Sequence, residues 1–306
     1  MIGIVILNFN GWDMTMNCIE SIRKSCKISY KIYIVDNAST IQMTKKFKLL
    51  IDNSYDCELL INQKNRGYSA GNNVGIKRAL EDNCEYILIS NNDVIFKNES
   101  IENLCSYLGK NKNFGIAGPK IYLPSGNIQE INMGCKMTLT GKYKYILRKT
   151  PFRRFFQKYV DEFHASKQDL GTPFEVYAVS GCCFMMSRCA ARKLFPMDEN
   201  TFLYEEENII GIKMEKIGLK TVYNTNSEII HLGGASTEKI SEFAYMCMVE
   251  SEIYYCLQYL HAFKIQVMPL YIIRTINFIF LYKGEKIREY LQKTCKALWN
   301  VKRSTI

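Results

Sequence analysis

The first ninety residues alternate between short apolar runs and helix-like stretches, and this order constrains the fold more than any other feature. The apolar runs are Ile2–Leu7, Lys31–Val35, Glu58–Ile61 and Tyr86–Ile89; the helix-like stretches are Asp13–Ser25 and Ala70–Asn83. Short runs rich in Ile, Leu, Val and Tyr are typical of strands. Strands that alternate with helices predict an α/β fold with a Rossmann-like, mostly parallel central sheet flanked by helices.

Polar residues follow each of these four predicted strands at its carboxyl end. They are Asn8 and Asn10, Asp36 and Asn37, Asn62 and Asn65, and then Asn91, Asn92 and Asp93. The carboxyl ends of parallel strands meet at one edge of the sheet, where α/β proteins bind ligands. Asn and Asp also favour turns, which explains any single cluster equally well. Four clusters in succession predict a polar ligand site.

Two residues at strand ends are candidates for holding a cation or a diphosphate. Asp93 offers the hard oxygen ligand that Mg²⁺ or Mn²⁺ prefers. His231 ends the apolar run Glu228–Ile230 and precedes Gly233 and Gly234, which makes it a second candidate. A strand-end Asp is also a common helix cap, and a single His is often structural.

Three successive carboxylates, Glu205, Glu206 and Glu207, follow the apolar run Phe202-Leu203-Tyr204. Acidic residues at a helix N-terminus interact favourably with the helix dipole, which accounts for at least one of them. A general base is expected where the chain leaves an apolar segment and enters a cleft. Glu206 and Glu207 both satisfy that condition.

Several other chemistries lack their sequence signals. The chain has no G-x-x-x-x-G-K-[ST] loop and no G-x-G-x-x-G after the first strand, as phosphate or dinucleotide loops require. Its twelve cysteines form no C-x-x-C pair, and there are three histidines. We therefore expect reduced, mostly buried thiols in a cytoplasmic protein, without a zinc site or a signal peptide.

The net charge of +10 is concentrated in two regions. Residues 131–160 hold eight Lys or Arg and no acid, and residues 261–306 hold nine against two Glu. Basic regions suit nucleic acid or an anionic membrane surface. No nucleic-acid-binding motif is present, so we expect no nucleic acid partner.

The tail after about residue 240 reads as helical, basic and aromatic. Its most apolar window, Ile265–Tyr282, contains Pro269, Arg274 and Asn277, which disfavour a membrane span. A helix lying on the bilayer, with Tyr271, Phe278, Phe280 and Trp299 at the headgroups, is one interpretation. A helix packed on the protein or in a homodimer has the same period.

Taken together, the motifs resemble the family 2 glycosyltransferases, especially the rhamnosyltransferase-like members of bacterial polysaccharide assembly. The matching segments are Val5-Ile6-Leu7-Asn8-Phe9-Asn10-Gly11, Val35-Asp36-Asn37-Ala38-Ser39-Thr40, Asn65–Gly75, Asn91-Asn92-Asp93, Ser180-Gly181, Phe202–Glu207 and His231-Leu232-Gly233-Gly234. The resemblance covers residues 1–240, and residues 241–306 are set apart as a helical C-terminal extension.

This resemblance implies a GT-A fold, a nucleoside-diphosphate sugar donor, a divalent metal (Mg²⁺ or Mn²⁺) and inversion at the anomeric carbon. Asp36 would contact the nucleotide base and Asp93 the metal. Gly67 and Asn72 would lie along the donor site, with Asn8, Asn10, Asn37, Asn91 and Asn92 also donor-binding. The acceptor would be a glycan or a lipid-linked glycan in cell-surface polysaccharide biosynthesis, and the enzyme would sit on the cytoplasmic face of the membrane.

The sequence departs from the family pattern at two positions. The family base is usually the Asp of a Glu-Asp pair, and here Glu207 stands in that place after Glu206. The acidic residue often found two positions later is Ile209. The Glu in place of Asp leaves a catalytically silent nucleotide-sugar-binding protein of the same fold as the alternative to a transferase, whereas Ile209 makes only the following helix less standard.

Overall fold

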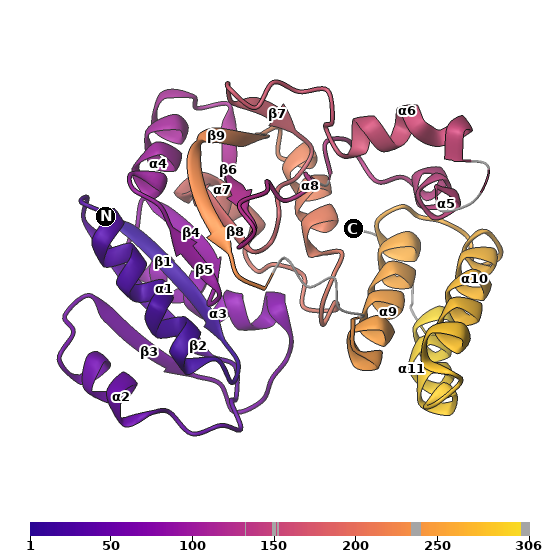
Figure 1. The fold of residues 1–306 in the computed structure, drawn as a ribbon, viewed down its shortest axis with the longest axis horizontal. Coiled ribbons are helices and arrows are strands. Elements are labelled where there is room, and N and C mark those ends of the chain that lie inside the picture. The colour runs from indigo at the N-terminus through magenta and orange to yellow at the C-terminus, as the bar shows by residue number, and fades with distance from the viewer. Residues whose placement is uncertain (132, 149–150, 152, 234–239, 301–306) are drawn as a thin grey trace.

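The computed structural model describes residues 1–131, 133–148, 151, 153–233 and 240–300 (Figure 1). Nine strands form one mixed sheet of order β3-β2-β1-β4-β8-β6-β9-β5, with β7 paired to β9. The strands are β1 (Ile2–Asn8), β2 (Tyr30–Asp36), β3 (Cys57–Ile61), β4 (Tyr86–Asn91), β5 (Val94–Phe96), β6 (Phe114–Tyr122), β7 (Phe174–Val176), β8 (Cys183–Ser187) and β9 (Lys220–His231).

Helices cover the sheet and extend beyond it on one side (Figure 1). They are α1 (Trp12–Ser25), α2 (Lys45–Asp52), α3 (Tyr68–Glu81), α4 (Ser100–Lys110), α5 (Leu139–Leu147), α6 (Arg153–Phe163), α7 (Arg188–Leu194), α8 (Glu206–Lys216), α9 (Glu242–Gln258), α10 (Lys264–Tyr282) and α11 (Ile287–Asn300). The predicted mostly parallel sheet with flanking helices is confirmed, and so is the helical C-terminal part.

The strand β1 shows why the first apolar run has no polar alternation. Ile2, Ile4 and Ile6 join the core on the α1 face, whereas Val5 joins the core on the opposite face. Both faces of the sheet are covered, so the run Ile2–Leu7 carries no polar side chain and its residues 2–6 are buried. The strands β3, β2, β1 and β4 run parallel to one another, which gathers the four polar clusters at one edge.

Two stretches differ from the sequence-based expectation. No apolar run in the sequence indicated the strand β6, because Gly115, Gly118 and Pro119 weaken its strand pattern. The apolar run Glu228–Ile230 is the end of a longer strand, β9, which begins at Lys220. The polar residues 224–227 of β9 lie at a register shift against β6.

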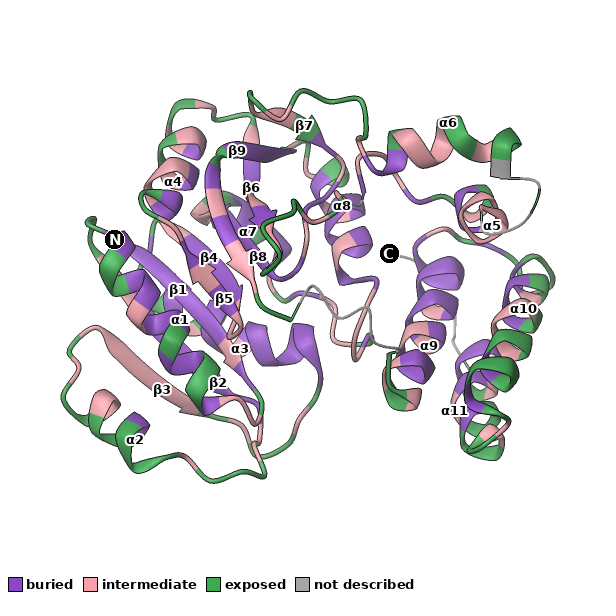
Figure 2. Ribbon diagram, viewed as in Figure 1, coloured by how far each residue is buried: buried purple, intermediate pink, exposed green. Residues whose placement is uncertain are grey.

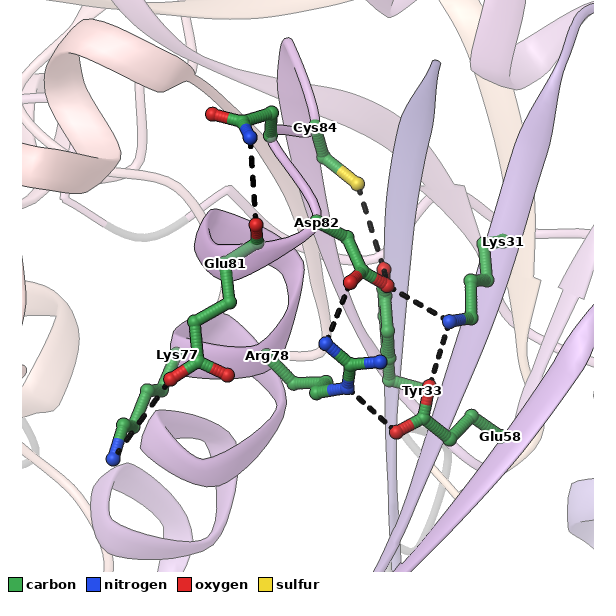
Figure 3. A network of polar contacts seen from close by, with 9 residues as sticks. Lys31, Tyr33, Glu58, Lys77, Arg78, Glu81, Asp82 and Cys84 are labelled. Atoms are coloured by element: carbon green, nitrogen blue, oxygen red, sulfur yellow. Dashed lines mark hydrogen bonds and ion pairs between the residues drawn. The ribbon is translucent and has the colours of Figure 1, made fainter.

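A network of charges ties the end of α3 to β2 and β3 (Figure 3). Arg78 donates to Glu58 over 2.6 Å and to Asp82 over 2.5 Å, and Lys31 lies within 2.8 Å of both carboxylates. Tyr33 donates its hydroxyl proton to Asp82. The pairs are partly exposed to solvent, which screens them, so each contributes little to the stability of the fold. The network lies near the strands' amino ends, away from the polar edge.

The C-terminal helices share a core with the rest of the chain. Val249, Ile253 and Phe278 cluster with Ile209 of α8 and with Met137 ahead of α5.

Seven of the twelve cysteines are buried and all twelve are free, as expected for reduced thiols.

The interfacial interpretation of the tail needs correction at two aromatic residues. Tyr271 and Phe278 were expected at the lipid headgroups, but they are 8% and 0% exposed and pack inside the helical extension. Phe280 and Trp299 are 81% and 59% exposed, and exposed residues follow the outward faces of α10 and α11 (Figure 2). Within the described residues, α10 is the one helix that by length and composition could cross a bilayer, with 28% of its apolar window buried.

Candidate active site

Asn8, at the end of β1, organises the polar edge of the sheet. Its amide donates to Asp36 over 3.2 Å, and its Oδ1 accepts from Asn92 over 3.2 Å and from the Thr15 hydroxyl over 2.9 Å. Three neighbouring strand ends are thereby joined through one buried side chain. Asp36 accepts this bond and those from Ser39 through Oδ1.

Asn10 and Asn37 brace the loops around that edge. Asn10 has a positive φ of 60°, and its Oδ1 accepts from the backbone N–H groups of Thr40 and Ile41. Asn37 donates to Asn65 over 2.9 Å and to the Gly67 carbonyl over 3.1 Å. In the protein without ligand these amides hold the loops in place, which is the turn chemistry that their residue types favour.

Gly67 joins this edge to the segment that precedes the three glutamates. Its φ is +90°, and a Cβ added there would lie 2.3 Å from the carbonyl oxygen of Phe202. The next residue, Tyr68, donates its backbone N–H to that same carbonyl over 2.9 Å. Only glycine permits so close an approach in this backbone conformation.

Asp93 and His231 face one another, as β5 pairs with β9. Asp93 Oδ2 lies 3.4 Å from His231 Nε2 and accepts the Gly233 N–H over 3.1 Å. Burial alone would lower the pKa of His231, but hydrogen bonding to Asp93 and Cys182 outweighs burial and raises that pKa to about 10. Burial acts to raise the pKa of Asp93, and hydrogen bonding to His231 brings it below its usual value.

The donor set at Asp93 fits a divalent cation. Asp93 Oδ1 is buried and has no hydrogen-bond partner among the described residues, so this oxygen could serve as a ligand to a cation. His231 adds a nitrogen nearby, and its Nδ1 contacts Gln129 Oε1 over 3.1 Å. Among the described residues no cluster of three His, Cys, Asp or Glu forms a metal site. Oxygen atoms of a bound nucleoside diphosphate would therefore have to complete the coordination shell of the cation. Gly234 lies outside the described residues.

Glu206 and Glu207 begin α8 and are set in a largely buried environment. Glu207 Oε1 accepts the Gly181 N–H over 3.0 Å, and the Tyr68 hydroxyl donates to the Gly181 carbonyl. Glu206 is 9% exposed, and its Oε2 has no partner in the described part of the chain. Within the described residues, neither carboxylate forms a direct ion pair.

Burial raises the pKa of both carboxyl groups. For Glu206 the charge of Glu207 raises the pKa further, to well above its usual value. For Glu207 burial is opposed by the Gly181 hydrogen bond, and the pKa stays raised. A carboxylate with a raised pKa is a stronger base toward a hydroxyl proton than an exposed one. Two such groups side by side titrate as a coupled pair.

A cavity of about 70 Å³ lies beside Glu207. Glu207, Ser180 and Gln129 line it, and Gln129 in turn contacts His231. The remaining lining residues are Gly118, Pro119, Ile121, Glu130, Ile131, Met133, Ala178, Val179, Cys183 and Tyr223.

The residues expected from the sequence fall into two groups in the structure. Asn8, Asp36, Asn92, Asn10 and Asn37 are linked at the polar edge, and Gly67 links that edge to the glutamate segment. Asp93 with His231, and Glu206 with Glu207, form the two chemical centres.

Asn72 and Asn91 are less directly placed. Asn72 is 0% exposed and donates to the Tyr68 carbonyl, with its Oδ1 unpartnered in the described residues. Asn91 ends β4 and its N–H donates to the Cys182 carbonyl. Their roles at the donor stay predictions.

Sequence reasoning missed Gln129 and Lys142. Gln129 lies in an irregular stretch that matches no motif, so nothing in the sequence signals its contact with His231. Lys142 lies in the basic region 131–160, which was expected to suit an anionic surface. It is 6% exposed and pairs with Glu205, because acidic partners far along the chain reach it.

Sequence comparison agrees with this geometry. The sequence model of "Glycosyl transferase family 2" matches residues 3–195. The chain belongs to this family. The match spans the polar edge, Asp93 and Ser180-Gly181, whereas the glutamate segment, His231 and the C-terminal helices lie beyond it.

Two curated glycosyltransferases are similar to the chain. The low-salt glycan biosynthesis hexosyltransferase Agl10 of Haloferax volcanii is 24% identical over 210 residues, 67% of this chain and 59% of that protein. The N-acetylglucosaminyl-diphospho-decaprenol L-rhamnosyltransferase of Mycobacterium tuberculosis is 23% identical over 157 residues, 50% of this chain and 48% of that protein. The chain thus aligns with about half the length of these relatives.

Solved structures show the same GT-A fold. GalNAc-T7, crystallised with UDP, GalNAc and Mn²⁺, is similar to the present chain with a TM-score of 0.59 at 16% identity. The match covers 84% of the present chain and 47% of the GalNAc-T7 chain. Residues 1–349 of TarS from S. aureus have a TM-score of 0.53 at 12% identity, covering 97% and 81%.

Proposed function

We propose that this family 2 protein is an inverting glycosyltransferase that moves a sugar from a nucleoside-diphosphate donor to a hydroxyl of a glycan or lipid-linked glycan. The observation that carries the proposal is the placement of Glu207. Its carboxylate is largely buried, has a raised pKa, and lines a cavity together with Gln129, which contacts His231. Family membership and the two similar glycosyltransferases support sugar transfer in glycan synthesis.

In the proposed reaction the Glu207 carboxylate takes the proton of the acceptor hydroxyl. The acceptor oxygen attacks the anomeric carbon from the side opposite the diphosphate, and the bond from that carbon to the diphosphate oxygen breaks. One new glycosidic bond forms with inversion, and the nucleoside diphosphate leaves. Glu206 is the alternative base, because both carboxylates begin α8.

Asp93 and His231 would hold Mg²⁺ or Mn²⁺, which neutralises charge on the leaving diphosphate when bound. The unpartnered Asp93 Oδ1 supports this assignment. Asp36 would contact the nucleotide base, and Asn8, Asn92 and Asn37 would keep its surroundings in shape.

Donor binding is the first test of the proposal. The protein is screened against a panel of nucleotide sugars by thermal shift, with and without Mn²⁺. A ligand that binds only the folded state raises the unfolding temperature. At least one nucleotide sugar should do so, more strongly with Mn²⁺. A panel without any stabilising member would contradict the proposal.

We further propose that the protein lies on the inner face of the cell membrane through α10, where a lipid-linked acceptor would be found. Its outward face carries Ile265, Ile272, Ile276, Ile279 and Phe280, which are 43–81% exposed. Lys283 and Lys296 are exposed nearby in the sequence. An apolar helix face flanked by cations matches an anionic lipid surface. A second copy of the chain is the competing occupant.

A further inference from the structure

The segment that leads into the candidate base is held from outside by the C-terminal helices. The Ser251 hydroxyl of α9 donates to the Leu203 carbonyl over 2.8 Å. Tyr254 and Tyr259 both donate to Asp198 Oδ2, over 2.8 and 2.6 Å. Residues 198–203 are therefore fixed by α9 before the chain reaches the three glutamates.

A chain of buried charges continues from there to Glu205. Arg274 of α10 donates to both oxygens of Glu252 of α9, over 2.7 and 2.9 Å. Lys142 of α5 lies 3.6 Å from Glu252 and also pairs with Glu205. The two acidic and two basic side chains are at most 19% exposed. Charges this buried need partners on every side, so the four form one unit.

Glu205 occupies an unusual position in the backbone. Tyr204 and Glu205 have φ angles of 72° and 66°, a region that residues other than glycine adopt only when their surroundings hold them there. Glu205 precedes α8, but its side chain does not cap the helix. It pairs with Lys142 and accepts from the Asn208 amide instead. The ion pair thus holds the turn from which Glu206 and Glu207 extend.

We propose that Lys142, Glu252 and Arg274 are positioning residues for the transfer reaction. They hold Glu205, and through its turn they orient the carboxylates at 206 and 207. The inference rests on the proposed function, in which one of those carboxylates is the base. It makes the C-terminal helices part of the catalytic unit, whatever surface their outward faces contact.

Electrostatics at Glu207 give the proposal a specific signature. Burial raises the Glu207 pKa most; the charge of Glu205 raises it further and the charge of Lys142 lowers it. The titratable groups around Glu207 are Glu205 and Glu206 on its own segment, Lys142 on α5, Tyr68 on α3, and Glu130, Cys183 and Tyr223 along the cavity. Breaking the Lys142–Glu205 pair from opposite ends should therefore move the Glu207 pKa in opposite directions.

The test compares kcat/KM against pH for Lys142→Met, Glu205→Gln and Lys286→Met. The last is the matched control, since it breaks a 3.2 Å ion pair with Glu242 in the same extension. The acid limb should move to higher pH in Lys142→Met and to lower pH in Glu205→Gln. The kcat of Lys142→Met should fall about a hundredfold, as when a catalytic group is misplaced. Lys286→Met should match the wild type.

Two further variants distinguish a loss of positioning from a loss of folding. Lys142→Arg keeps the charge and should restore the wild-type pH profile. The double variant Lys142→Met/Glu205→Gln removes both charges of the pair and should fold, judged by cooperative unfolding, with the acid limb between those of the single variants.

If folded, active single variants keep the wild-type acid limb, or both shift it the same way, the positioning role is wrong. A wild type that transfers no sugar from any donor would instead overturn the proposed function.

Discussion

The Oε1 atom of Glu207 accepts the backbone N–H of Gly181 over 3.0 Å, so the first turn of α8 is fixed to the loop that enters β8. Tyr68 holds the carbonyl of the same glycine. The candidate base is thereby tied to a rigid sheet strand on one side and to the start of α3 on the other. A rigid mounting of this kind is what proton transfer at a defined distance requires.

Glu207→Gln should lower kcat by about 10²–10⁴, because the amide cannot accept the acceptor proton. Donor affinity should be retained, which titration calorimetry with the nucleotide sugar measures. Glu206→Gln should have a smaller effect, and the exposed Glu285→Gln none. Full kcat in both Glu207→Gln and Glu206→Gln would place the base elsewhere.

The pH dependence of kcat/KM tests whether Glu207 is the base, because the direction of its pKa shift predicts where activity is lost. A raised Glu207 pKa means that the proton stays on to a higher pH than in an ordinary glutamic acid. Since the base acts when deprotonated, kcat/KM of the wild type should fall on acidification at a pH above the usual Glu range near 4.5. An acid limb at or below that range would contradict the burial argument.

Asp93→Ala should abolish metal-dependent turnover, because its buried Oδ1, which has no hydrogen-bond partner in the described part of the chain, is the oxygen proposed to bind the cation. Mn²⁺ binding in the presence of the nucleoside diphosphate, measured by calorimetry, should weaken together with kcat. Asp52→Ala, an exposed position on α2, is the control. Near-normal turnover of Asp93→Ala without added metal would show that Asp93 does not hold a cation.

Gly67→Ala tests the contact between the loop at Gly67 and the segment Phe202–Glu207. The new Cβ would meet the Phe202 carbonyl at 2.3 Å with φ at +90°, and such strain costs about 1–3 kcal/mol. Gly126→Ala is a matched control, since φ there is +84° with nothing within 4 Å. Urea unfolding should show destabilisation in both variants, and only Gly67→Ala should also lose kcat. Equal kcat values in the two variants would show that the contact between Gly67 and Phe202 does not contribute to catalysis.

The parallel half of the sheet and its polar edge could be predicted from the sequence, because both depend on local patterns. Each strand is a short apolar run followed directly by its own Asn or Asp, so Asn8, Asp36 and Asp93 could be named without tertiary information. β6 was missed because Gly118 and Pro119 interrupt its pattern, and its pairing with β9 and β8 decides its conformation.

Burial of charge was the second kind of information that the sequence lacked. Lys142 belongs to a run of basic residues, which predicts a solvated surface. Its partners Glu205 and Glu252 lie 63 and 110 positions further along the chain, so the local pattern could not reveal them. The same holds for Tyr271 and Phe278, which face their neighbouring helices, whereas Phe280, two residues on, faces outward.

The membrane proposal predicts that the full-length protein sediments with vesicles containing phosphatidylglycerol. Binding should rise with the anionic fraction and fall with salt, since each nearby cation contributes about 1 kcal/mol that salt screens. Ile276→Asp/Phe280→Asp should abolish binding, and Leu49→Asp, at an exposed apolar residue of α2, should not. Protein that stays in the supernatant at low salt, with self-association lost in the double variant, would assign the face to a homodimer.

The release of nucleoside diphosphate from a nucleotide sugar tests the central claim most directly, because a silent binding protein also passes the thermal-shift screen. The donor that stabilises the protein most is incubated with wild type, Glu207→Gln and Asp93→Ala in the presence of Mn²⁺, with and without glycan or lipid-linked acceptors. The wild type should release nucleoside diphosphate repeatedly and faster with acceptor, and both variants should be impaired by at least about 10²-fold. A wild type that binds the donor but releases no more product than Asp93→Ala, with every acceptor tried, would contradict the claim that this chain transfers sugars.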